Sequence, residues 1–483
     1  MSSGIRGLAG EAIIYGATTM VGRLLNWLLM PFYIRTLTTG EYGVIVNIYG
    51  VISILLVIFT YGLETGFFRF SKEDKNPSVY STSLIMLACS SFLLVVVSWI
   101  FSPSLSDFFY GGNYHKSVFL MGLIVAFDSF LSIPFANLRL DNKAFKFGII
   151  KITNIFLNIF FNLFFLLAVP WLIKHHLLND FCQTLYLKGN GVFYVLLSNL
   201  IASAGISLFF ISDFKLLKFG LDRTLAKRML SYSWPVLLVG ITGMITQNSD
   251  KILMPKLIKN NGLEALAIYG ANFKIGVLMS LFTQSFRFAF EPYFFKNEGK
   301  GILSYARIMD YFISFGLAIF LGVILFMDII NVILTKEYLS GNIIIPVVLL
   351  GQLFYGIYFN LSLWYKLTDK TIYGAFFGLL GMVVTLVLNF VLIPLMGIIG
   401  GAFSMLAGYL LMMVVSYFLG QHYFKVPYPL RRIAIYFLGA GLIYYLNTVI
   451  NLDAIYLAYF FKSLLFLFFA LIFVLVQKKL SFK

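Results

Sequence analysis

The chain has 483 residues, of which 60% are hydrophobic and 12% are charged. An ordinary soluble domain has about a quarter of its residues charged, so this composition excludes one. The 36 Lys and Arg outnumber the 20 Asp and Glu, which gives a formal net charge of +16. In so apolar a chain, a basic surplus indicates a membrane, whose cytoplasmic flanks collect Lys and Arg, rather than nucleic acid.

Cysteine usage and the N-terminus add two expectations. Cys89 lies in an apolar run and Cys182 in a polar connector, with no CxxC motif and no Cys/His cluster. We therefore expect neither a disulfide framework nor a metal site. The first ten residues are too short and too weakly apolar for a cleaved signal peptide, so the apolar stretch that follows is expected to remain as a membrane span.

Long apolar runs predict an all-α integral membrane protein with about fourteen transmembrane helices. About 20 apolar residues cross a bilayer as a helix, because a helix satisfies its own backbone hydrogen bonds in lipid. Two of the runs contain Pro134 and Pro235 and the last two lie close together, so twelve is the alternative count. The predicted spans are 12–34, 41–65, 79–101, 116–138, 147–170, 191–212, 229–254, 266–290, 305–327, 342–365, 371–394, 397–419, 433–450 and 453–476.

The distribution of positive residues predicts the orientation. With the N-terminus in the cytoplasm, 23 of the 36 Lys and Arg fall in cytoplasmic connectors and 8 in outer ones. Positive residues accumulate in cytoplasmic loops, so both termini are predicted to be cytoplasmic and the number of spans even. The remaining cations fall within spans: Arg23, Lys151, Lys274, Arg287 and Lys462.

The sequence also contains an internal repeat. At a shift of 227 residues, Tyr42-Gly43 matches Tyr269-Gly270, Glu64 matches Glu291, Lys143 matches Lys370 and Asn162 matches Asn389. Upstream, a shift of 224 pairs the LLMP ending at Pro31 with the ILMP ending at Pro255. Six helices per copy is an even number, so the repeats are parallel. The predicted division is a bundle at 1–212, a basic cytoplasmic linker at 213–228, a bundle at 229–419, and two extra helices with a cytoplasmic tail at 420–483.

Several sequence blocks resemble a known family. They are GEAIIYGATTMVGRLLNWLLMPFYIRTLTTGEYGV, YGLETGFFRF, NSDKILMPKL and IYGANFKIGVLMSLFTQSFRFAFEPYFF. They resemble the bacterial polysaccharide biosynthesis proteins, the Wzx-type oligosaccharide flippases of the multidrug/oligosaccharidyl-lipid/polysaccharide (MOP) exporter superfamily. The resemblance implies a MATE-like fold of two six-helix bundles that form a V, two additional C-terminal helices, and alternating access around a central cavity.

The resemblance also implies a cargo and a place in the cell. The cargo is an oligosaccharide repeat unit on undecaprenyl diphosphate, moved from the cytoplasmic to the outer leaflet of the bacterial inner membrane for O-antigen, capsule or exopolysaccharide synthesis. Partners are the lipid bilayer, this lipid-linked oligosaccharide, a polysaccharide polymerase and a chain-length regulator. No nucleic acid, cofactor or catalytic activity is implied, beyond coupling to H⁺ or Na⁺.

Cations within spans are the candidate substrate-binding residues, because burying charge in a membrane is costly. Arg23 lies near the middle of the first span, where its guanidinium would hold diphosphate oxygens bidentately or bond helix-end carbonyls. Lys274 is a second cation for the cavity, or a partner of Asp250. Arg287 lies near the inner end of its helix, where its head can reach the surface. Lys151 contacts cargo or pairs with Asp128.

Acidic residues are the candidates for coupling and gating. Asp250 and Asp128 are carboxylates within spans, and burial that neutralises a carboxylate suits proton coupling. Asp250 alternatively caps a helix end beside Lys251. Two acid and base pairs, Glu64 with Arg69 and Glu291 with Lys296, occur at equivalent positions of the repeats. They form either an inner gate or anchors at the membrane surface.

Three other functions were weighed against the lipid-linked oligosaccharide flippase. A MATE-type multidrug exporter predicts an acidic cavity and twelve helices. A flippase for the peptidoglycan precursor lipid II shares the mechanism and differs in cargo. A membrane glycosyltransferase or polymerase predicts a sizeable polar loop, whereas the longest connector, 171–190, is about 20 residues. With no phosphate-binding P-loop, any driving force is an ion gradient or downstream polymerisation.

Overall fold

The computed structural model describes the backbone of residues 3–73, 78–177, 189–214, 220–296, 301–450, 452 and 454–479. Within these ranges, the side chains of 3–15, 17, 19, 73, 288–289, 291–296 and 479 are not described. Every regular element of the described residues is helical. The chain forms two compact units, Met1–Gly270 and Ala271–Lys483.

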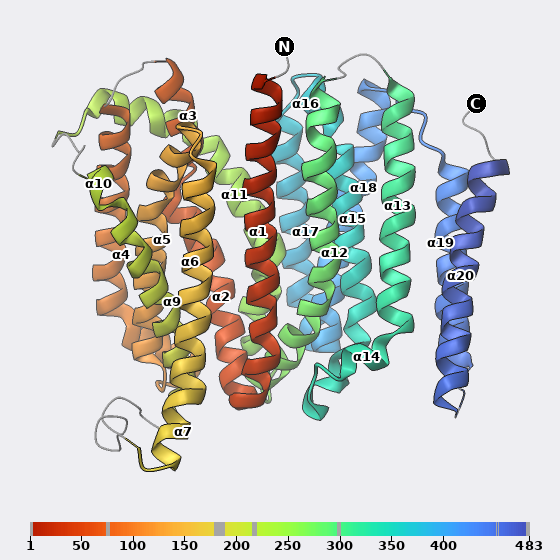
Figure 1. The fold of residues 1–483 in the computed structure, drawn as a ribbon, viewed down its shortest axis with the longest axis horizontal. Coiled ribbons are helices and arrows are strands. Elements are labelled where there is room, and N and C mark those ends of the chain that lie inside the picture. The colour runs from red at the N-terminus through yellow and green to blue at the C-terminus, as the bar shows by residue number, and fades with distance from the viewer. Residues whose placement is uncertain are drawn as a thin grey trace. The chain divides into compact units, whose positions relative to one another are not determined.

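The first unit consists of long helices that run side by side, with the short α3 at one end and α7 at the other (Figure 1). Its elements are α1 Ser3–Thr36, α2 Thr39–Thr60, α3 Leu63–Glu73, α4 Ser78–Tyr110, α5 His115–Leu140, α6 Ala144–Leu163, the π-helix η1 Phe164–Ala168, α7 Val169–Lys174, α9 Gly191–Ser207, the 3₁₀ helix η2 Leu208–Phe210, α10 Ile211–Phe214, α11 Arg223–Leu257 and the first turns of α12 Gly262–Lys296.

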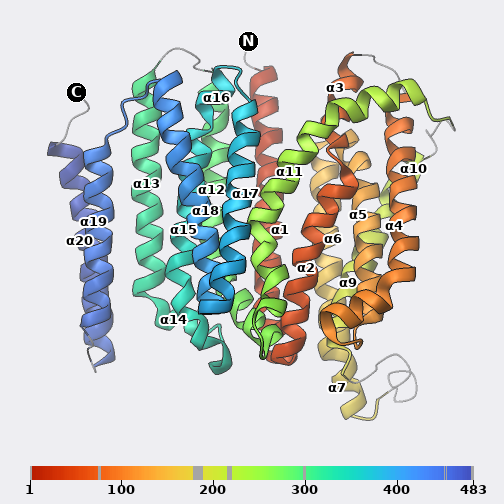
Figure 2. The ribbon, with the colours of Figure 1, turned by 180° about the vertical axis from the view of Figure 1, so that it is seen from behind.

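The second unit begins within α12 and ends with a pair of helices that pack against each other (Figure 2). Its other elements are α13 Ile302–Leu325, α14 Met327–Asn331, the 3₁₀ helix η3 Lys336–Ile344, α15 Ile345–Leu361, α16 Leu363–Leu367, α17 Ile372–Met396, α18 Ile398–Tyr423, α19 Leu430–Val449 and α20 Ile455–Lys479. The final pair, α19 and α20, packs on α13.

The predicted membrane spans all fall on helices. Thirteen helices among the described residues are long and apolar enough to cross a membrane. The remaining predicted span lies on α1, a helix of 34 residues whose centre carries Arg23 and Asn26. The prediction of an all-α membrane protein with about fourteen spans is therefore confirmed.

The residues at the helix ends explain where α2 and α11 begin. Thr38 and Glu41 form a capping box at the start of α2, which satisfies backbone N–H groups that have no partner within the helix. α2 ends at Thr60, and the capping residue Tyr61 that follows has a left-handed φ of 33°, with Gly62 next at φ 68°. Asp222 caps α11 by accepting a hydrogen bond of 3.0 Å from the backbone N–H of Leu225.

The start of α11 lies within the predicted linker 213–228, so part of that linker is helical. The first turns of α11 also have an apolar side that packs into a core. Leu225 and Met229 of α11 are buried together with Leu63 and Phe67 of α3. α11 contacts α2, α3 and α4 and therefore belongs to the first compact unit. The compact units divide at Gly270, whereas the sequence repeat divides at the linker, and the repeat-based division stays a prediction.

Close contacts between helices occur at two glycines that the repeat places at equivalent positions. A Cβ on Gly43 would lie 2.0 Å from the backbone oxygen of Leu263, and one on Gly270 would lie 2.6 Å from a methyl carbon of Val46. The neighbouring Tyr42 and Tyr269 are 1% and 0% exposed. Small residues allow helices within a membrane to approach closely, and here they bring α2 against α12.

Candidate functional site

The four predicted binding cations lie on three helices and differ in exposure. Arg23 of α1 is exposed. Lys151 of α6 is exposed, with its Nζ 4.1 Å from the ring centroid of Phe135. Arg287 of α12 is exposed, with its guanidinium carbon 4.3 Å from the ring centroid of Phe359. Lys274 of α12 is half-buried. Lys274 and Arg287 belong to the second unit and the other two to the first.

The aspartates within the spans are held by protein groups. Asp250 is 1% exposed and accepts hydrogen bonds from the hydroxyl of Tyr269 and from Nζ of Lys251, the latter at 3.2 Å. The adjacent Lys251 is thus its ion-pair partner. Asp128 of α5 is half-buried and accepts a 2.7 Å hydrogen bond from the hydroxyl of Ser203 on α9.

Lys151 and Asp128, which the sequence suggested as a pair and which both lie in the described part of the chain, form no hydrogen bond or salt bridge with each other. Lys151 lies near enough to Asp128 for an electrostatic interaction. Their direct contacts are to other groups: the ammonium of Lys151 makes a cation–π contact with Phe135, and the carboxylate of Asp128 accepts a hydrogen bond from Ser203.

The predicted gate residues have different partners. The half-buried Glu64 of α3 accepts a hydrogen bond from Arg139 of α5 and forms an ion pair with it. Arg69, five residues further along α3, places its guanidinium over the ring of Tyr232 on α11, 4.4 Å from the centroid. The expected pairing of Glu64 with Arg69 is wrong, because successive turns of α3 face α5 and α11. The side chains of Glu291 and Lys296 lie outside the described residues.

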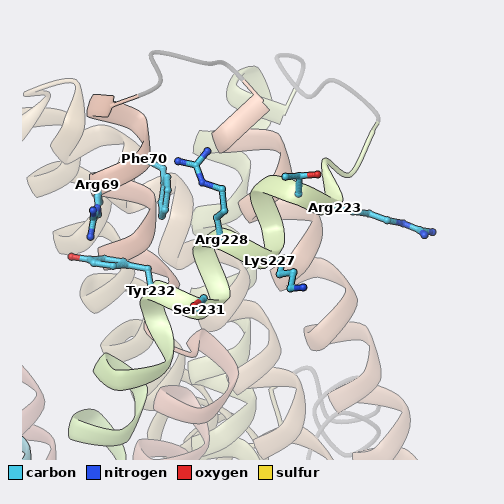
Figure 3. Close-up of a pocket in the computed structure, with 8 residues that line it drawn as sticks. Arg69, Phe70, Arg223, Lys227, Arg228, Ser231 and Tyr232 are labelled. Atoms are coloured by element: carbon cyan, nitrogen blue, oxygen red, sulfur yellow. The ribbon is translucent and has the colours of Figure 1, made fainter.

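A basic pocket of about 840 Å³ lies between α3 and α11 in the first unit. We call it the α3–α11 pocket (Figure 3). None of its lining residues is acidic. They are Arg69, Phe70, Arg223, Thr224, Lys227, Arg228, Ser231 and Tyr232.

Helical spacing produces this lining. Residues four apart lie on one side of a helix, so Lys227 and Ser231 follow Arg223, and Tyr232 follows Arg228. The opposite positions, Leu225 and Met229, pack with Leu63 and Phe67 in the core below. Packing of the apolar side of α11 against α3 sets the rotation of α11, and this rotation places the basic side along the pocket.

Aromatic rings hold two of the arginines. Arg228 lies 5.0 Å from the ring centroid of Phe70, and Arg69 lies 5.9 Å from the same centroid and 4.4 Å from that of Tyr232. The Phe70 and Tyr232 rings meet edge to face, with centroids 6.1 Å apart and an interplanar angle of 88°. Figure 3 shows Arg69 over Tyr232 and Arg228 beside Phe70, whereas Arg223 extends away from α3. Such cation–π contacts position the guanidinium groups over the rings.

The pocket was not predicted from the sequence. Arg223, Lys227 and Arg228 fall in the predicted basic cytoplasmic linker 213–228, and Arg69 was assigned to a gate or a surface anchor. The available signal was the spacing of three cations and Tyr232 along residues 223–232, which is helical. The spacing alone does not indicate a pocket, because the sequence does not reveal that α11 begins at Arg223 and packs on α3.

Comparisons with known proteins identify the family and the fold. The model of the family described as "Polysaccharide biosynthesis protein" matches residues 8–298. No curated protein matches the chain significantly. The chain is similar to the lipid II flippase MurJ in an inward closed conformation, with a TM-score of 0.73 and 15% identity, over 97% of this chain and 100% of that one.

The chain is also similar to a multidrug resistance MATE family transporter of the MOP superfamily. The inward-facing conformation gives a TM-score of 0.64 at 14% identity, over 85% of this chain and 97% of that one. The outward-facing conformation gives 0.56 at 15% identity, over 87% and 98%. At these identities the similarity establishes the fold alone, which is the fold of MOP-superfamily transporters.

Proposed function

Because the chain belongs to the polysaccharide biosynthesis protein family, we propose that it is a flippase for an undecaprenyl-diphosphate-linked oligosaccharide repeat unit. The repeat unit moves from the cytoplasmic to the outer leaflet of the bacterial inner membrane, for O-antigen, capsule or exopolysaccharide synthesis. Transport proceeds by alternating access, as the MOP transporter fold suggests. The protein carries no catalytic residues in this proposal, because no bond of the cargo is broken.

The difference in exposure between the cations and the aspartates of the spans supports an anionic cargo. Three of the cations, Arg23, Lys151 and Arg287, are exposed on their helices. The aspartates Asp128, Asp250 and Asp310 are half-buried or buried, and each accepts a hydrogen bond from a protein group. Accessible charge within the spans is therefore mainly positive, which suits a diphosphate and opposes a cationic drug.

Orientation and energy supply form part of the proposal. The excess of positive residues in one set of connectors supports cytoplasmic termini. Transport is coupled to H⁺ or Na⁺ through Asp250 or Asp128, two carboxylates of the first unit that lie within candidate membrane spans. A polysaccharide polymerase and a chain-length regulator consume the translocated repeat unit and pull transport forward.

Deletion of the gene tests this function. We expect loss of one surface polysaccharide and accumulation of its lipid-linked repeat unit on the cytoplasmic side, both restored by the intact gene. An unchanged surface with increased drug sensitivity would contradict the proposal and favour a multidrug exporter. Loss of peptidoglycan with accumulation of lipid II would contradict it and favour a lipid II flippase.

A further inference from the structure

We propose that the α3–α11 pocket binds the diphosphate group of a polyprenyl-linked substrate at the membrane surface. This inference rests on the proposed function, since it names the part of the cargo that the pocket recognises. The candidate substrate-binding cations predicted from the sequence all lie elsewhere, on α1, α6 and α12. The pocket is therefore an additional site.

The charge of the pocket selects an anion. Arg69, Arg223, Lys227 and Arg228 contribute four positive charges, and the other four lining residues are uncharged. Like charges gathered in one pocket repel one another, and a bound anion relieves that repulsion.

The type of donor favours phosphate. Guanidinium groups present paired N–H donors that match two oxygens of one phosphate, and Arg69 and Arg228 both lie within 6 Å of the Phe70 ring centroid, at 5.9 and 5.0 Å. Two arginines on one aromatic platform suit a ligand with two adjacent phosphates. The hydroxyl-bearing Thr224 and Ser231 also line the pocket and can donate to phosphate oxygens.

The framework of the pocket is prepared for binding. Phe70 and Tyr232 hold the two arginines, so less side-chain freedom is lost when a ligand arrives. Beneath them, a Cβ added to Gly66 of α3 would lie 2.7 Å from Oγ of Ser233 on α11, so the two helices are in close contact. The core of Leu63, Phe67, Leu225 and Met229 fixes this contact.

The position of the pocket favours a lipid-anchored ligand over a soluble one. α3 is the final part of the candidate span Thr39–Lys72, and α11 is the candidate span Arg223–Leu257. The pocket uses the last turns of the first span and the first turns of the second, so it lies at one end of both. Phosphate groups of lipids lie at that level of a bilayer, and Tyr is enriched there.

Binding of farnesyl diphosphate, a short polyprenyl diphosphate, tests the inference. The full-length chain in nanodiscs of zwitterionic phosphatidylcholine is titrated with this probe. The double substitution Arg69→Gln and Arg228→Gln is expected to weaken binding by roughly tenfold or more, because charge-assisted hydrogen bonds are lost. Lys72→Gln is the matched control, since Lys72 is an exposed cation of α3 outside the pocket and its loss is expected to change the affinity less than twofold.

Competition identifies the source of the phosphate. Inorganic pyrophosphate is expected to displace the probe at higher concentration, because it carries the anion without the lipid. In nanodiscs that contain phosphatidylglycerol, the affinity for farnesyl diphosphate is expected to stay within about threefold of its value in phosphatidylcholine nanodiscs. Displacement by phosphatidylglycerol as effective as that by pyrophosphate would overturn the diphosphate assignment and make the pocket a site for phospholipid headgroups. Equal weakening by Lys72→Gln and by the double substitution would overturn the pocket itself.

The same variants separate this inference from the proposed function. If the double variant binds the probe as tightly as the intact chain does, the pocket inference fails, whatever the effect of gene deletion. If the pocket binds the probe as expected but gene deletion leaves every surface polysaccharide unchanged, the proposed function fails and the binding site stands. Thermal unfolding of each variant, expected within about 2 °C of the intact chain, excludes misfolding as the cause of lost binding.

Discussion

Arg432 of α19 forms a buried ion pair with Asp310 of α13, with 3.1 Å between Nη1 and Oδ2. The side chains are 4% and 0% exposed. Gln477 of α20 donates a 2.6 Å hydrogen bond to the same carboxylate oxygen of Asp310. One aspartate of α13 therefore holds both C-terminal helices, and the hydroxyl of Tyr436 on α19 accepts a second hydrogen bond from Gln477.

Removal of the Asp310 charge is expected to destabilise the second unit strongly. Asp310→Asn leaves the guanidinium of Arg432 buried without its counterion, which costs about 3–5 kcal/mol of unfolding free energy. The measurement is thermal or denaturant unfolding of the purified chain. The control is Asp328→Asn, because Asp328 also pairs with a residue of α20, Lys462, but its side chain is 59% exposed. Exposed pairs contribute about 1 kcal/mol or less, so equal losses in both variants would contradict this account.

Gly43 is expected to tolerate no side chain. In Gly43→Ala the new Cβ would lie 2.0 Å from a backbone oxygen, that of Leu263, which cannot move aside as a side chain can. Overpacking of this kind costs about 1–3 kcal/mol, or more where backbone must shift. Gly243→Ala in α11 is the control, because nothing lies within 4 Å of its Cβ. Ala is about 1 kcal/mol better than Gly within a helix, so Gly243→Ala is expected to be neutral or stabilising, and a similar loss in both variants would refute the steric explanation.

Arg23 and Lys274 are expected to be required for transport, and substitution of either residue is expected to leave the fold intact. Each substitution to Ala, expressed at the normal level, is expected to abolish complementation of the polysaccharide defect. Arg23→Lys is expected to restore only part of the activity, because an ammonium cannot hold two phosphate oxygens as a guanidinium does. Lys116→Ala, at an exposed cation of α5, serves as the control. Full activity of both Ala variants would remove Arg23 and Lys274 from the substrate path.

The helices of this protein could be predicted from the sequence because their signal is local. An apolar run of about 20 residues needs a helix in lipid whatever surrounds it, so each predicted span falls on a helix. The ends were less predictable. α11 begins at Arg223 rather than after the linker because Asp222 caps it and Leu225 packs on α3, and hydropathy registers neither effect.

The partners of charged residues could not be predicted in the same way. Glu64 was matched to Arg69 because the two are close in sequence, yet its partner Arg139 is 75 residues away on α5. The rotation of each helix about its axis determines which neighbour a side chain faces, and packing sets that rotation. Asp310 and Arg432 illustrate the same limit, since Arg432 directly precedes the predicted span 433–450 and so falls in a connector, although it is buried against α13.

Asp250 is expected to carry the coupling ion, and two substitutions in its network separate charge from structure. Asp250→Asn can still accept from Tyr269 but has lost its charge, so transport is expected to become independent of an imposed H⁺ or Na⁺ gradient. Tyr269→Phe removes one hydrogen bond and keeps the carboxylate, so gradient dependence is expected to persist at a cost of about 1–2 kcal/mol of stability. The measurement is uptake of lipid-linked oligosaccharide into vesicles under each gradient. If Asp250→Asn still transports in response to a gradient, Asp250 is not the coupling residue. If gradient dependence is lost in Asp128→Asn instead, coupling is assigned to Asp128.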